Sequence, residues 1–325
     1  ALTTGADAIH PGYGFLAENA YFTDKCLDNK ISFIGPSPDA IYKMGNKTIA
    51  RKIALAHNIP VAMGSEGNIS NEEEAIAVAE KIGYPVIIKA ASGGGGRGMR
   101  IVRKSEEMEK LFVIASKEAE KAFKDPSVFI EKYIENPKHI EFQILGDKKG
   151  NVIHLGEREC SIQRKHQKLL EEAPSGALDD RLREIMGSTA VRIAKAVGYY
   201  SAGTVEFLLD SEKNFYFMEM NTRIQVEHPV TEVITGIDLI EQQIRIAKGE
   251  ELKIRQEDIK LSGWAIECRI NAEDVQAGFA PDPGKIDKLS LPSGPNIRID
   301  TGVQAGSSIV PNYDSMIAKL IVSGK

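Results

Sequence analysis

Apolar and amphipathic segments alternate along most of the chain, a pattern that is typical of a mixed α/β protein. Short apolar runs predict strands at residues 8–10, 31–34, 86–89, 99–103, 128–130, 140–145, 152–155, 204–210 and 317–323. Amphipathic stretches predict helices at residues 18–29, 46–57, 106–123, 179–197 and 239–248. Helices interleaved among strands in this way indicate the α/β or α+β fold class.

Two further helices are predicted from their start signals. Ser37 and Pro38 have the chemistry of an N-cap followed by the first turn of a short helix. Ser70 and Glu73 form a potential capping box for a helix that runs to Lys81, and Gly83 closes that helix.

A β-hairpin is predicted where the strand at residues 204–210 meets a second strand that starts at Phe215. The turn between them places Asp210 opposite Phe215 and therefore Glu206 opposite Glu219. Facing carboxylates repel each other, and a hard cation such as Mg²⁺ between them would turn this cost into a binding site. The alternative, two solvated glutamates on an edge hairpin, fits less well because both strands are otherwise apolar.

The second strand of this hairpin leads into the segment FMEMNTRIQVEHPVTE at residues 217–232. If the segment stays extended, its odd-numbered residues share one face, because side chains alternate along a strand. That face would carry Glu219, Asn221, Arg223, Gln225 and Glu227. Carboxylates, amides and a guanidinium in one row are groups that bind metal ions and small anions.

A glycine-rich loop, SGGGGRG at residues 92–98, separates two of the predicted strands. It formally contains G-x-G-x-x-G, but a dinucleotide-binding loop opens a helix, and the sequence also lacks G-x-x-x-x-G-K-[ST]. A strand–glycine–strand flap could instead cover phosphates with its backbone N–H groups and close over a substrate. The alternative is a flexible hairpin tip, but four consecutive glycines followed by Arg97 favour the flap.

Other charged residues are weaker candidates when each is taken alone. Lys89 ends an apolar strand, and Lys47 stands in a first helical turn, where a cation opposes the helix dipole; a solvated surface position is the more common role for either lysine. Arg269 lies within an apolar strand, where a buried guanidinium needs a partner. Residues 131–134 could hold an adenine ring, whereas the basic run at residues 163–168 is typical of a solvated face.

Length and composition indicate the number of domains and the broad class of protein. A chain of 325 residues has room for two or three domains, and the change near Trp264 to short strands with Pro and Gly turns suggests a separate module. The net charge of −5 argues against a nucleic-acid partner, and no apolar run reaches the roughly 18–20 residues that cross a membrane. Three scattered cysteines without a signal peptide favour a reducing, cytoplasmic compartment. Because the sequence opens and closes in mid-pattern, we expect a piece of a longer polypeptide.

Motifs recur in a fixed order from end to end: HPGYGFLAEN, MGNK, YPVIIKAASGGGGRGMR, EKYIENPKHIEFQ, ERECSIQRKHQKLLEEAP, GTVEF, MEMNTRIQVEHPVTE, ECRINAED and YDSMIAKL. Together they resemble biotin carboxylase, the ATP-grasp component of biotin-dependent carboxylases. RIQVEHPVTE and ECRINAED are specific to that family, whereas the flap and the paired glutamates belong to the wider superfamily.

The resemblance implies an ATP-grasp fold of the α+β/α/β class. It implies a partial N-terminal Rossmann-like domain at residues 1–45, an ATP-grasp domain at residues 46–255 and the start of a C-terminal domain at residues 256–325. A mobile lid is expected at about residues 62–133.

The resemblance further implies a ligase that forms a carbon–nitrogen bond. ATP would convert bicarbonate to carboxyphosphate, and the carboxyl group would then pass to N1′ of biotin on a biotin carboxyl carrier protein. Mg²⁺ or Mn²⁺ would accompany ATP, and a carboxyltransferase and a second copy in a homodimer are the other implied partners. The final acceptor, which could be pyruvate, acetyl-CoA or another acyl-CoA, stays open.

The resemblance also assigns individual residues. ATP would bind at Lys47, Lys89, Gly93, Gly94, Gly95, Gly96, Gly98, Glu131, Lys132, Ile134, His139, Gln163, His166, Glu206 and Glu219. The metal would bind at Glu206, Glu219 and Asn221, bicarbonate at Arg223, Gln225, Val226 and Lys168, and biotin at Tyr13, Gly14 and Arg269. The implied catalytic residues are Glu227 as general base, Arg223 on bicarbonate, Lys168 beside carboxyphosphate and Arg269 beside the biotin enolate.

Two other functions stay open. A different ATP-grasp ligase, such as the carbamoyl phosphate synthase large subunit or a purine-pathway carboxylase, shares the flap and the metal glutamates. An inactive fragment of a carboxylase could keep nucleotide affinity alone, because strands that the family places beside residues 8–10 are missing.

Overall fold

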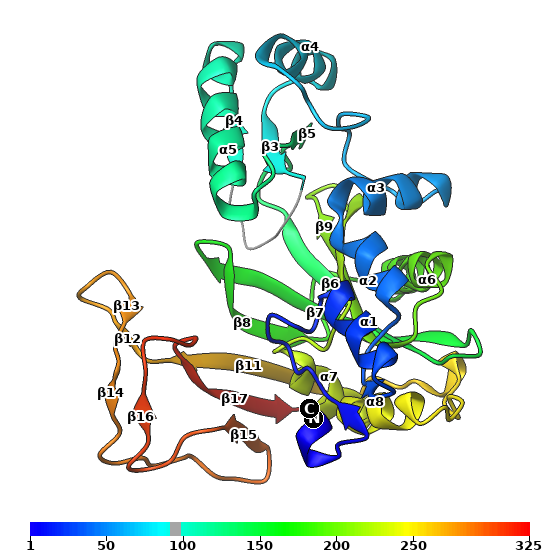
Figure 1. The fold of residues 1–325 in the computed structure, drawn as a ribbon, viewed down its shortest axis with the longest axis vertical. Helices are drawn as coiled ribbons and strands as arrows, with labels where there is room; N and C mark the ends of the chain where they lie inside the picture. Colours follow the sequence, from blue (N-terminus) through cyan, green and yellow to red (C-terminus); the bar gives the residue numbers. More distant parts are fainter. Residues whose placement is uncertain (92–98) are drawn as a thin grey trace.

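The computed structural model describes residues 1–91 and 99–325, and a large antiparallel sheet forms its centre (Figure 1). Within the described residues this sheet has eight strands in the order β10-β9-β6-β7-β8-β11-β17-β15. Their bounds are β6 Lys138–Gly146, β7 Val152–Arg164, β8 Gln167–Ala173, β9 Ser201–Leu209, β10 Phe215–Asn221, β11 Trp264–Asn271, β15 Ile297–Thr301 and β17 Met316–Gly324. The sheet therefore joins strands from positions more than 150 residues apart into one surface.

Helices cover the buried parts of this sheet. Helix α6 (Asp180–Ala196) packs on β6 and β7, and α8 (Leu239–Ala247) packs on β9. Helix α7 (His228–Thr235) lies against β7, β8, β11 and β17. Apolar side chains of α6 and the strands form the largest core, in which Phe142 and Phe207 meet edge to face. Removing these apolar surfaces from water is the main force that holds the helices on the sheet.

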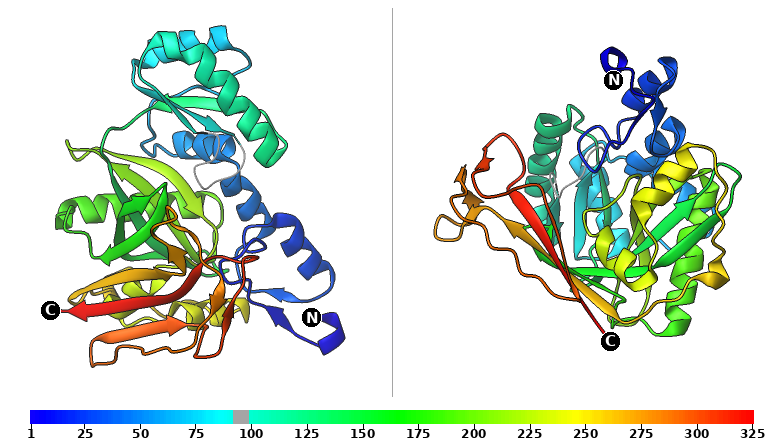
Figure 2. Two further views of the ribbon diagram at one scale, coloured as in Figure 1. Left: turned by 90° about the vertical axis from the view of Figure 1, so that its left-hand side faces the viewer. Right: turned by 90° about the horizontal axis from the view of Figure 1, so that it is seen from below.

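A smaller unit stands apart from the sheet, at the top of Figure 1 and of the left view in Figure 2. It contains α4 (Glu72–Ile82), β3 (Val86–Ala90), β4 (Arg100–Val102), α5 (Met108–Phe123) and β5 (Val128–Lys132). Strand β3 pairs with β4 and β5, and α4 and α5 close a separate apolar core over these strands. Residues 92–98, for which a glycine flap is predicted, lie outside the described residues.

The start of α4 differs from the prediction by one residue. Asn71 is the N-cap, and its Oδ1 accepts a hydrogen bond from the Glu74 amide at 2.9 Å. Glu74 Oε2 in turn accepts a hydrogen bond from the Ser70 amide at 2.8 Å. The predicted box of Ser70 and Glu73 is therefore wrong, because Asn is as good a cap as Ser and Glu74 stands at the third helical position.

The N-terminal residues form a small layer beside the edge of the sheet. Strands β1 (Ala8–Ile9) and β2 (Ser32–Phe33) make a short parallel pair, next to α1 (Ala20–Asp28). Helices α2 (Pro38–Gly45) and α3 (Lys47–Ala56) pack against β10. The predicted N-cap of α2 is confirmed, because Ser37 Oγ accepts a hydrogen bond from the Ala40 amide. Short 3₁₀ helices complete the described elements at Leu2–Thr4, Ser105–Glu107 and Gln256–Asp258.

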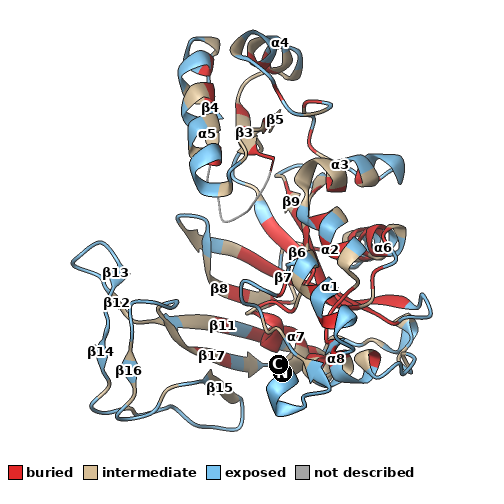
Figure 3. Cartoon of the chain, in the orientation of Figure 1, coloured by how far each residue is buried: buried red, intermediate tan, exposed pale blue. Residues whose placement is uncertain are grey.

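The chain after Trp264 extends the central sheet. Strand β11 pairs with β8 on one side and β17 on the other, and β15 pairs with β17, so these three strands belong to the central sheet. Between β11 and β17, the pairs β12 (Glu273–Asp274) with β13 (Ala280–Pro281) and β14 (Gly284–Lys285) with β16 (Ser308–Ile309) form a thin arm. Most of this arm is exposed, in contrast to the buried middle of the sheet (Figure 3).

The predicted hairpin is present, with a shifted start. Phe215 pairs with Leu209 instead of Asp210, and an irregularity between Phe217 and Glu219 moves the register by one residue. Because of this irregularity Glu206 lies directly opposite Glu219, as predicted.

The segment 217–232 is not extended throughout, so the expectation of one continuous strand face is wrong. Strand β10 ends at Asn221, and Glu227 is the N-cap residue of α7. Pro229 in the first turn favours a helix at this point. Among the described helices, none is both long and apolar enough to cross a membrane.

Candidate active site

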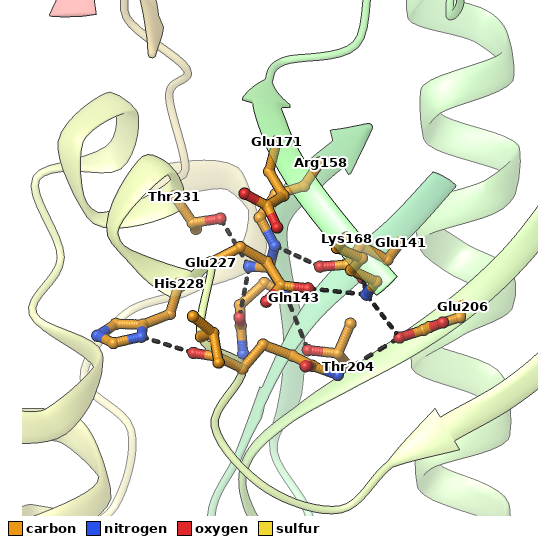
Figure 4. A network of polar contacts seen from close by, with 12 residues as sticks. Glu141, Gln143, Arg158, Lys168, Glu171, Thr204, Glu206, Glu227, His228 and Thr231 are labelled. Atoms are coloured by element: carbon orange, nitrogen blue, oxygen red, sulfur yellow. Dashed lines mark hydrogen bonds and ion pairs between the residues drawn. The ribbon is translucent and has the colours of Figure 1, made fainter. Parts of the chain in front are cut away.

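Lys168 is the centre of a buried network of charges (Figure 4). It lies on β8, just after the tight turn from β7, and its side chain is only 14% exposed. Its Nζ donates hydrogen bonds to Glu141 Oε2 at 2.5 Å, Glu206 Oε1 at 2.9 Å and Glu227 Oε1 at 2.7 Å. The interpretation of the basic run at residues 163–168 as a solvated face is therefore wrong for Lys168.

Glu227 holds a cation on each of its two oxygens. Lys168 binds Oε1, and the Arg269 Nη2 atom donates a hydrogen bond to Oε2 at 2.9 Å. Arg269 also donates from Nε to Glu171 Oε1 at 2.8 Å, so its guanidinium joins β11, β8 and the start of α7. The prediction that Arg269, within an apolar strand, needs a partner is confirmed by these contacts.

Arg158 on β7 also belongs to the network and is fully buried. Its guanidinium donates to Glu141 Oε1 at 2.6 Å and to Gln143 Oε1 at 2.7 Å. It also donates to the hydroxyls of Thr231 and Thr204. Removal of one member would leave buried charges without partners, which is strongly destabilising.

The predicted metal pair lies on the same side of the hairpin, close to Lys168. Glu206 is buried, and its Oε1 accepts hydrogen bonds from Lys168 and from Asn221 Nδ2 at 2.7 Å. Glu219 is half-buried and pairs with Lys47 of α3 at 3.4 Å. The structure therefore brings Glu206, Asn221 and Lys168 into contact and sets Glu219 beside them on the edge strand.

His139 and Gln163 connect this hairpin to the neighbouring strands. The Nε2 atom of His139 lies 2.6 Å from Glu206 Oε2, and Gln163 Nε2 lies 2.8 Å from His139 Nδ1. His166 lies in the turn between β7 and β8, with a positive φ of 65°, and is exposed. Of the three residues predicted on the ribose side, His139 and Gln163 are thus in contact, whereas His166 is exposed in the turn.

Arg223 and Gln225 lie in the loop between β10 and α7. Arg223 Nη1 donates to Gln225 Oε1 at 3.1 Å, and Arg223 Nε donates to Glu18 Oε2 at 3.0 Å. The carbonyl of Val226 accepts a hydrogen bond from Lys319 Nζ of β17 at 2.8 Å. The candidate bicarbonate residues are therefore fixed by groups from both ends of the chain.

The candidate ATP residues of the smaller unit form their own cluster. Lys89 Nζ lies 2.6 Å from Glu131 Oε2, and Arg51 Nη1 of α3 lies 2.8 Å from Glu131 Oε1. Lys132 Nζ donates to the carbonyls of Gly83 and Tyr84, and Ile134 is half-buried just after β5. Of the remaining ATP candidates, Gly93, Gly94, Gly95, Gly96 and Gly98 lie outside the described residues.

Tyr13 and Gly14 are exposed in the loop before α1. Burial of part of the phenol and the nearby carboxylate of Glu267 raise the pKa of Tyr13, while Arg269 lowers it. The N-terminal loop therefore lies within electrostatic range of Arg269.

The charges of the network fix its protonation. Burial alone would raise the pKa of Glu227, but Lys168, Arg269 and Arg158 outweigh burial and hold it well below its usual range. Burial would lower the pKa of Lys168, but Glu141, Glu206 and Glu227 raise it well above its usual value. Burial and the nearby Lys319 lower the pKa of His228 to about 3, so this histidine is neutral.

Several site residues were missed by sequence reasoning. They are Glu18, Glu141, Arg158, Glu171, Glu267 and Lys319. Most of them interrupt apolar strands, and a charged residue in a strand buried on both faces is itself a sign of a buried pair. The sequence alone does not say which of these residues point to the same spot, because their strands are far apart in the chain.

Comparisons with known proteins agree with this architecture. Residues 46–255 match the family model described as "Carbamoyl-phosphate synthase L chain, ATP binding domain". Residues 1–41 match "Biotin carboxylase, N-terminal domain", and residues 267–325 match "Biotin carboxylase C-terminal domain". The two flanking models distinguish this chain from a carbamoyl phosphate synthase.

The chain belongs to the biotin carboxylase family. Biotin carboxylase 1 of Bacillus subtilis (strain 168) is 57% identical over all of this chain and 72% of its own length. Biotin carboxylase of Nostoc sp. is 59% identical with the same coverage. This membership identifies an ATP-grasp ligase that carboxylates biotin with ATP and bicarbonate.

Solved structures of biotin carboxylases share the fold. The biotin carboxylase domain dimer of Hydrogenobacter thermophilus 2-oxoglutarate carboxylase, solved with MgADP, ADP and bicarbonate, superimposes with a TM-score of 0.97 at 56% identity. It covers all of this chain, which spans 72% of that domain. The Campylobacter jejuni biotin carboxylase, solved as a β,γ-ATP complex, also gives a TM-score of 0.97, at 51% identity and the same coverage.

Proposed function

We propose that the buried network around Lys168, Glu227 and Arg269 is the place where bicarbonate is activated and biotin is carboxylated. The observation that carries this proposal is the fully buried Glu227, whose two oxygens accept hydrogen bonds from Lys168 and Arg269. When a substrate anion draws one cation away, this carboxylate becomes a better base for the substrate proton, and the cations can stabilise the new negative charge.

The first step is the formation of carboxyphosphate. Arg223, Gln225 and the Val226 backbone would hold bicarbonate, since a planar guanidinium offers two parallel donors to such an anion. A bicarbonate oxygen bonds to the γ-phosphorus, the bond from that phosphorus to ADP breaks, and Glu227 takes the bicarbonate proton. Lys168 would meet the phosphorylated anion, and its departure from Glu227 would raise the pKa of that carboxylate, which makes it a better base.

The second step transfers the carboxyl group to biotin. Arg269 would stabilise the oxyanion on biotin as N1′ loses its proton to the leaving phosphate. The new bond joins N1′ to the carboxyl carbon, and the bond from that carbon to the phosphate oxygen breaks. Tyr13 and Gly14 would border the biotin ring, because their loop lies within electrostatic range of Arg269.

ATP would lie between the sheet and the smaller unit, across β3, β5 and the edge hairpin. Lys47 and Lys89 would bind phosphates, and Glu131, Lys132 and Ile134 would border the adenine. His139, Gln163 and His166 would line the ribose, with Gly93, Gly94, Gly95, Gly96 and Gly98 as further phosphate donors. Lys47 pairs with Glu219 and Lys89 pairs with Glu131, so both ammonium groups are already positioned to bind the ATP phosphates.

The oxygen donors of the edge hairpin fit the divalent metal that the family uses. Glu206 and Glu219 face each other in register, and Asn221 contacts Glu206. Carboxylate and amide oxygens are the ligands that Mg²⁺ or Mn²⁺ prefers. The ion, when bound, would neutralise charge on the ATP phosphates, and these three residues would hold it.

Family membership supports a proposal for the wider assembly. Relatives named as subunits of 2-oxoglutarate and pyruvate carboxylases work within larger enzymes, and one similar structure is a dimer. We propose a biotin carboxyl carrier protein or domain and a carboxyltransferase as partners, and a homodimer as the assembly. The domain limits proposed are residues 1–45, 46–255 with the lid at 62–133, and 256–325, in a reducing cytoplasmic compartment.

The test is ADP formation by the purified protein. We expect ADP release that needs bicarbonate and rises when free biotin is added. ADP release indifferent to both would overturn the proposal, and release that depends on ammonia would favour the carbamoyl phosphate synthase type.

A further inference from the structure

Two glutamates that the proposed function leaves unused face each other beside Arg269. Glu171 on β8 and Glu267 on β11 are directly opposite in the antiparallel register, and both are fully buried. Among the described residues, neither oxygen of Glu267 has a hydrogen-bond partner, and the same holds for Glu171 Oε2. Three unpartnered carboxyl oxygens thus lie in one buried place.

The surroundings of this pair are partly apolar and partly charged. Ala265, Ile321, Val230 and Ile234 pack together in the core cluster next to the pair, between the sheet and α7. The charged or titratable groups that act on the pair come from every neighbouring element: Arg269 and Cys268 of β11, Lys319 of β17, Glu227 before α7, Glu141 of β6, and Tyr13 of the N-terminal loop.

Ionising both of these facing carboxylates at once is energetically unfavourable in this buried setting. An unpaired buried carboxylate is costly, and a second negative charge on the directly opposite residue adds repulsion. Arg269 donates to Glu171 and Glu227 but makes no hydrogen bond to Glu267. Burial and the neighbouring carboxylates accordingly raise the pKa of Glu267 to about 8, against the opposing effect of Lys319. Burial raises the pKa of Glu171 to about 7 in spite of Arg269.

We propose that Glu171 and Glu267 hold one proton between them in the resting enzyme, and that this proton positions Arg269 between the pair and Glu227. The inference rests on the proposed function, because it concerns the guanidinium that would meet biotin. Glu171 and Glu267 are positioning residues here and do not touch substrate.

The proton sets the balance of charge around Arg269. With one proton on the pair, the guanidinium has one carboxylate on each side, Glu171 and Glu227. Loss of that proton gives the pair a second negative charge, which draws Arg269 toward β8 and β11. The guanidinium then supports the oxyanion on biotin less well, so the carboxylation rate falls as the pH rises through the pKa of the pair.

The first experiment compares pH profiles of biotin-dependent ADP formation in the purified enzyme. We expect the profile of the unchanged enzyme to fall on its alkaline side, with an apparent pKa near those of the pair, because such groups titrate together. Glu267→Gln cannot lose a proton, so that fall should move to higher pH by at least about one unit. Glu172→Gln, one residue along β8 and on its other face, should leave the fall in place.

The second experiment reads the proton directly and needs no turnover. Infrared spectra at pH 7 should show the C=O stretch of a protonated carboxylic acid, which disappears on titration to pH 10. Glu267→Gln should remove the band or shift its titration, and Glu171→Gln should move its titration to lower pH, because the opposing carboxylate is gone. Absence of the band in the unchanged enzyme would overturn the proposal even if a variant failed to fold.

The outcomes separate the two proposals. An enzyme that forms ADP in response to biotin, with an alkaline limb that Glu267→Gln does not shift, contradicts the shared proton and leaves the proposed function intact. An enzyme with the infrared band but without a biotin response contradicts the proposed function instead.

Discussion

The ionisable side chains of the candidate site share their hydrogen-bond partners with one another. Lys168 contacts three carboxylates, and two of these carboxylates contact other cations in turn. The protonation of each member therefore depends on several neighbours at once, which strengthens the network as long as every group is satisfied. A substitution that keeps the shape of a side chain in this network can still change the balance of charge among its members.

Glu227→Gln tests this at one residue. The amide keeps the shape of the side chain but cannot take the bicarbonate proton, so we expect carboxylation to fall by about 10²–10⁴-fold. Lys168 keeps Glu141 and Glu206, and Arg269 keeps Glu171, so nucleotide binding should persist. Steady-state ADP formation and a direct ATP-binding assay check the two parts, with Glu241→Gln on the exposed side of α8 as control. Loss of ATP binding would contradict the role given to Glu227.

At the level of elements, strand pairing and helix ends decide where the chemistry lies. The hairpin of β9 and β10 sets Glu206 opposite Glu219, and the N-terminus of α7 sets Glu227 beside β8 and β11. Each element brings one or two charged groups, and none contains the site by itself.

The helix α4 offers a test at this scale, because sequence and structure name different caps. Asn71→Ala should destabilise the first turn of α4 by about 1 kcal/mol, since one amide loses its side-chain acceptor. Ser70→Ala should have no such effect, because its backbone amide, and not its hydroxyl, makes the contact with Glu74. Hydrogen exchange of the α4 amides measures both variants. Equal protection in both would contradict the cap assignment.

The elements also show what sequence reasoning can reach. Periodicity and turn chemistry located most helices and strands and predicted Glu206 opposite Glu219, because these depend on neighbouring residues. They missed α7 and β8, where short segments are set by packing between distant strands. The identity of the substrate came from the motifs and their resemblance to a family, since spacing alone indicated only a site for a cation and anions.

At the scale of the molecule, one sheet carries charges from both halves of the chain. Burial would raise the pKa of Glu206, but Lys168 and His139 outweigh it and lower the pKa well below the ordinary value. The pKa of Glu267, in contrast, is raised to about 8 by burial first of all. A lowered carboxyl pKa makes the stability of the fold fall as the pH becomes acidic, whereas a raised carboxyl pKa makes it fall as the pH rises.

Stability should therefore pass through a maximum with pH. Glu206 and Glu227 contribute stability that is present above the ordinary glutamate pKa of 4.5 and is lost as the pH falls toward their folded values. Glu267 contributes stability that is full below 4.5 and is lost as the pH rises through about 8. Urea unfolding at a series of pH values should show the highest free energy of unfolding between about pH 5 and 7. A free energy that rises throughout from pH 5 to 8, and does so equally in Glu267→Gln, would contradict the assignment for Glu267.

The wide sequence separation within the site has a consequence for synthesis of the protein. Glu18 bonds Arg223 across 205 positions, Arg269 bonds Glu171 across 98 and Lys319 bonds Val226 across 93. A ribosome releases the chain from the N-terminus, so the last of these contacts forms only when Lys319 has emerged. A chain that stops before Lys319 lacks the hydrogen bond from Lys319 to the Val226 carbonyl, which holds the loop before α7. The order of the strands thus makes the complete set of these contacts depend on translation through residue 319.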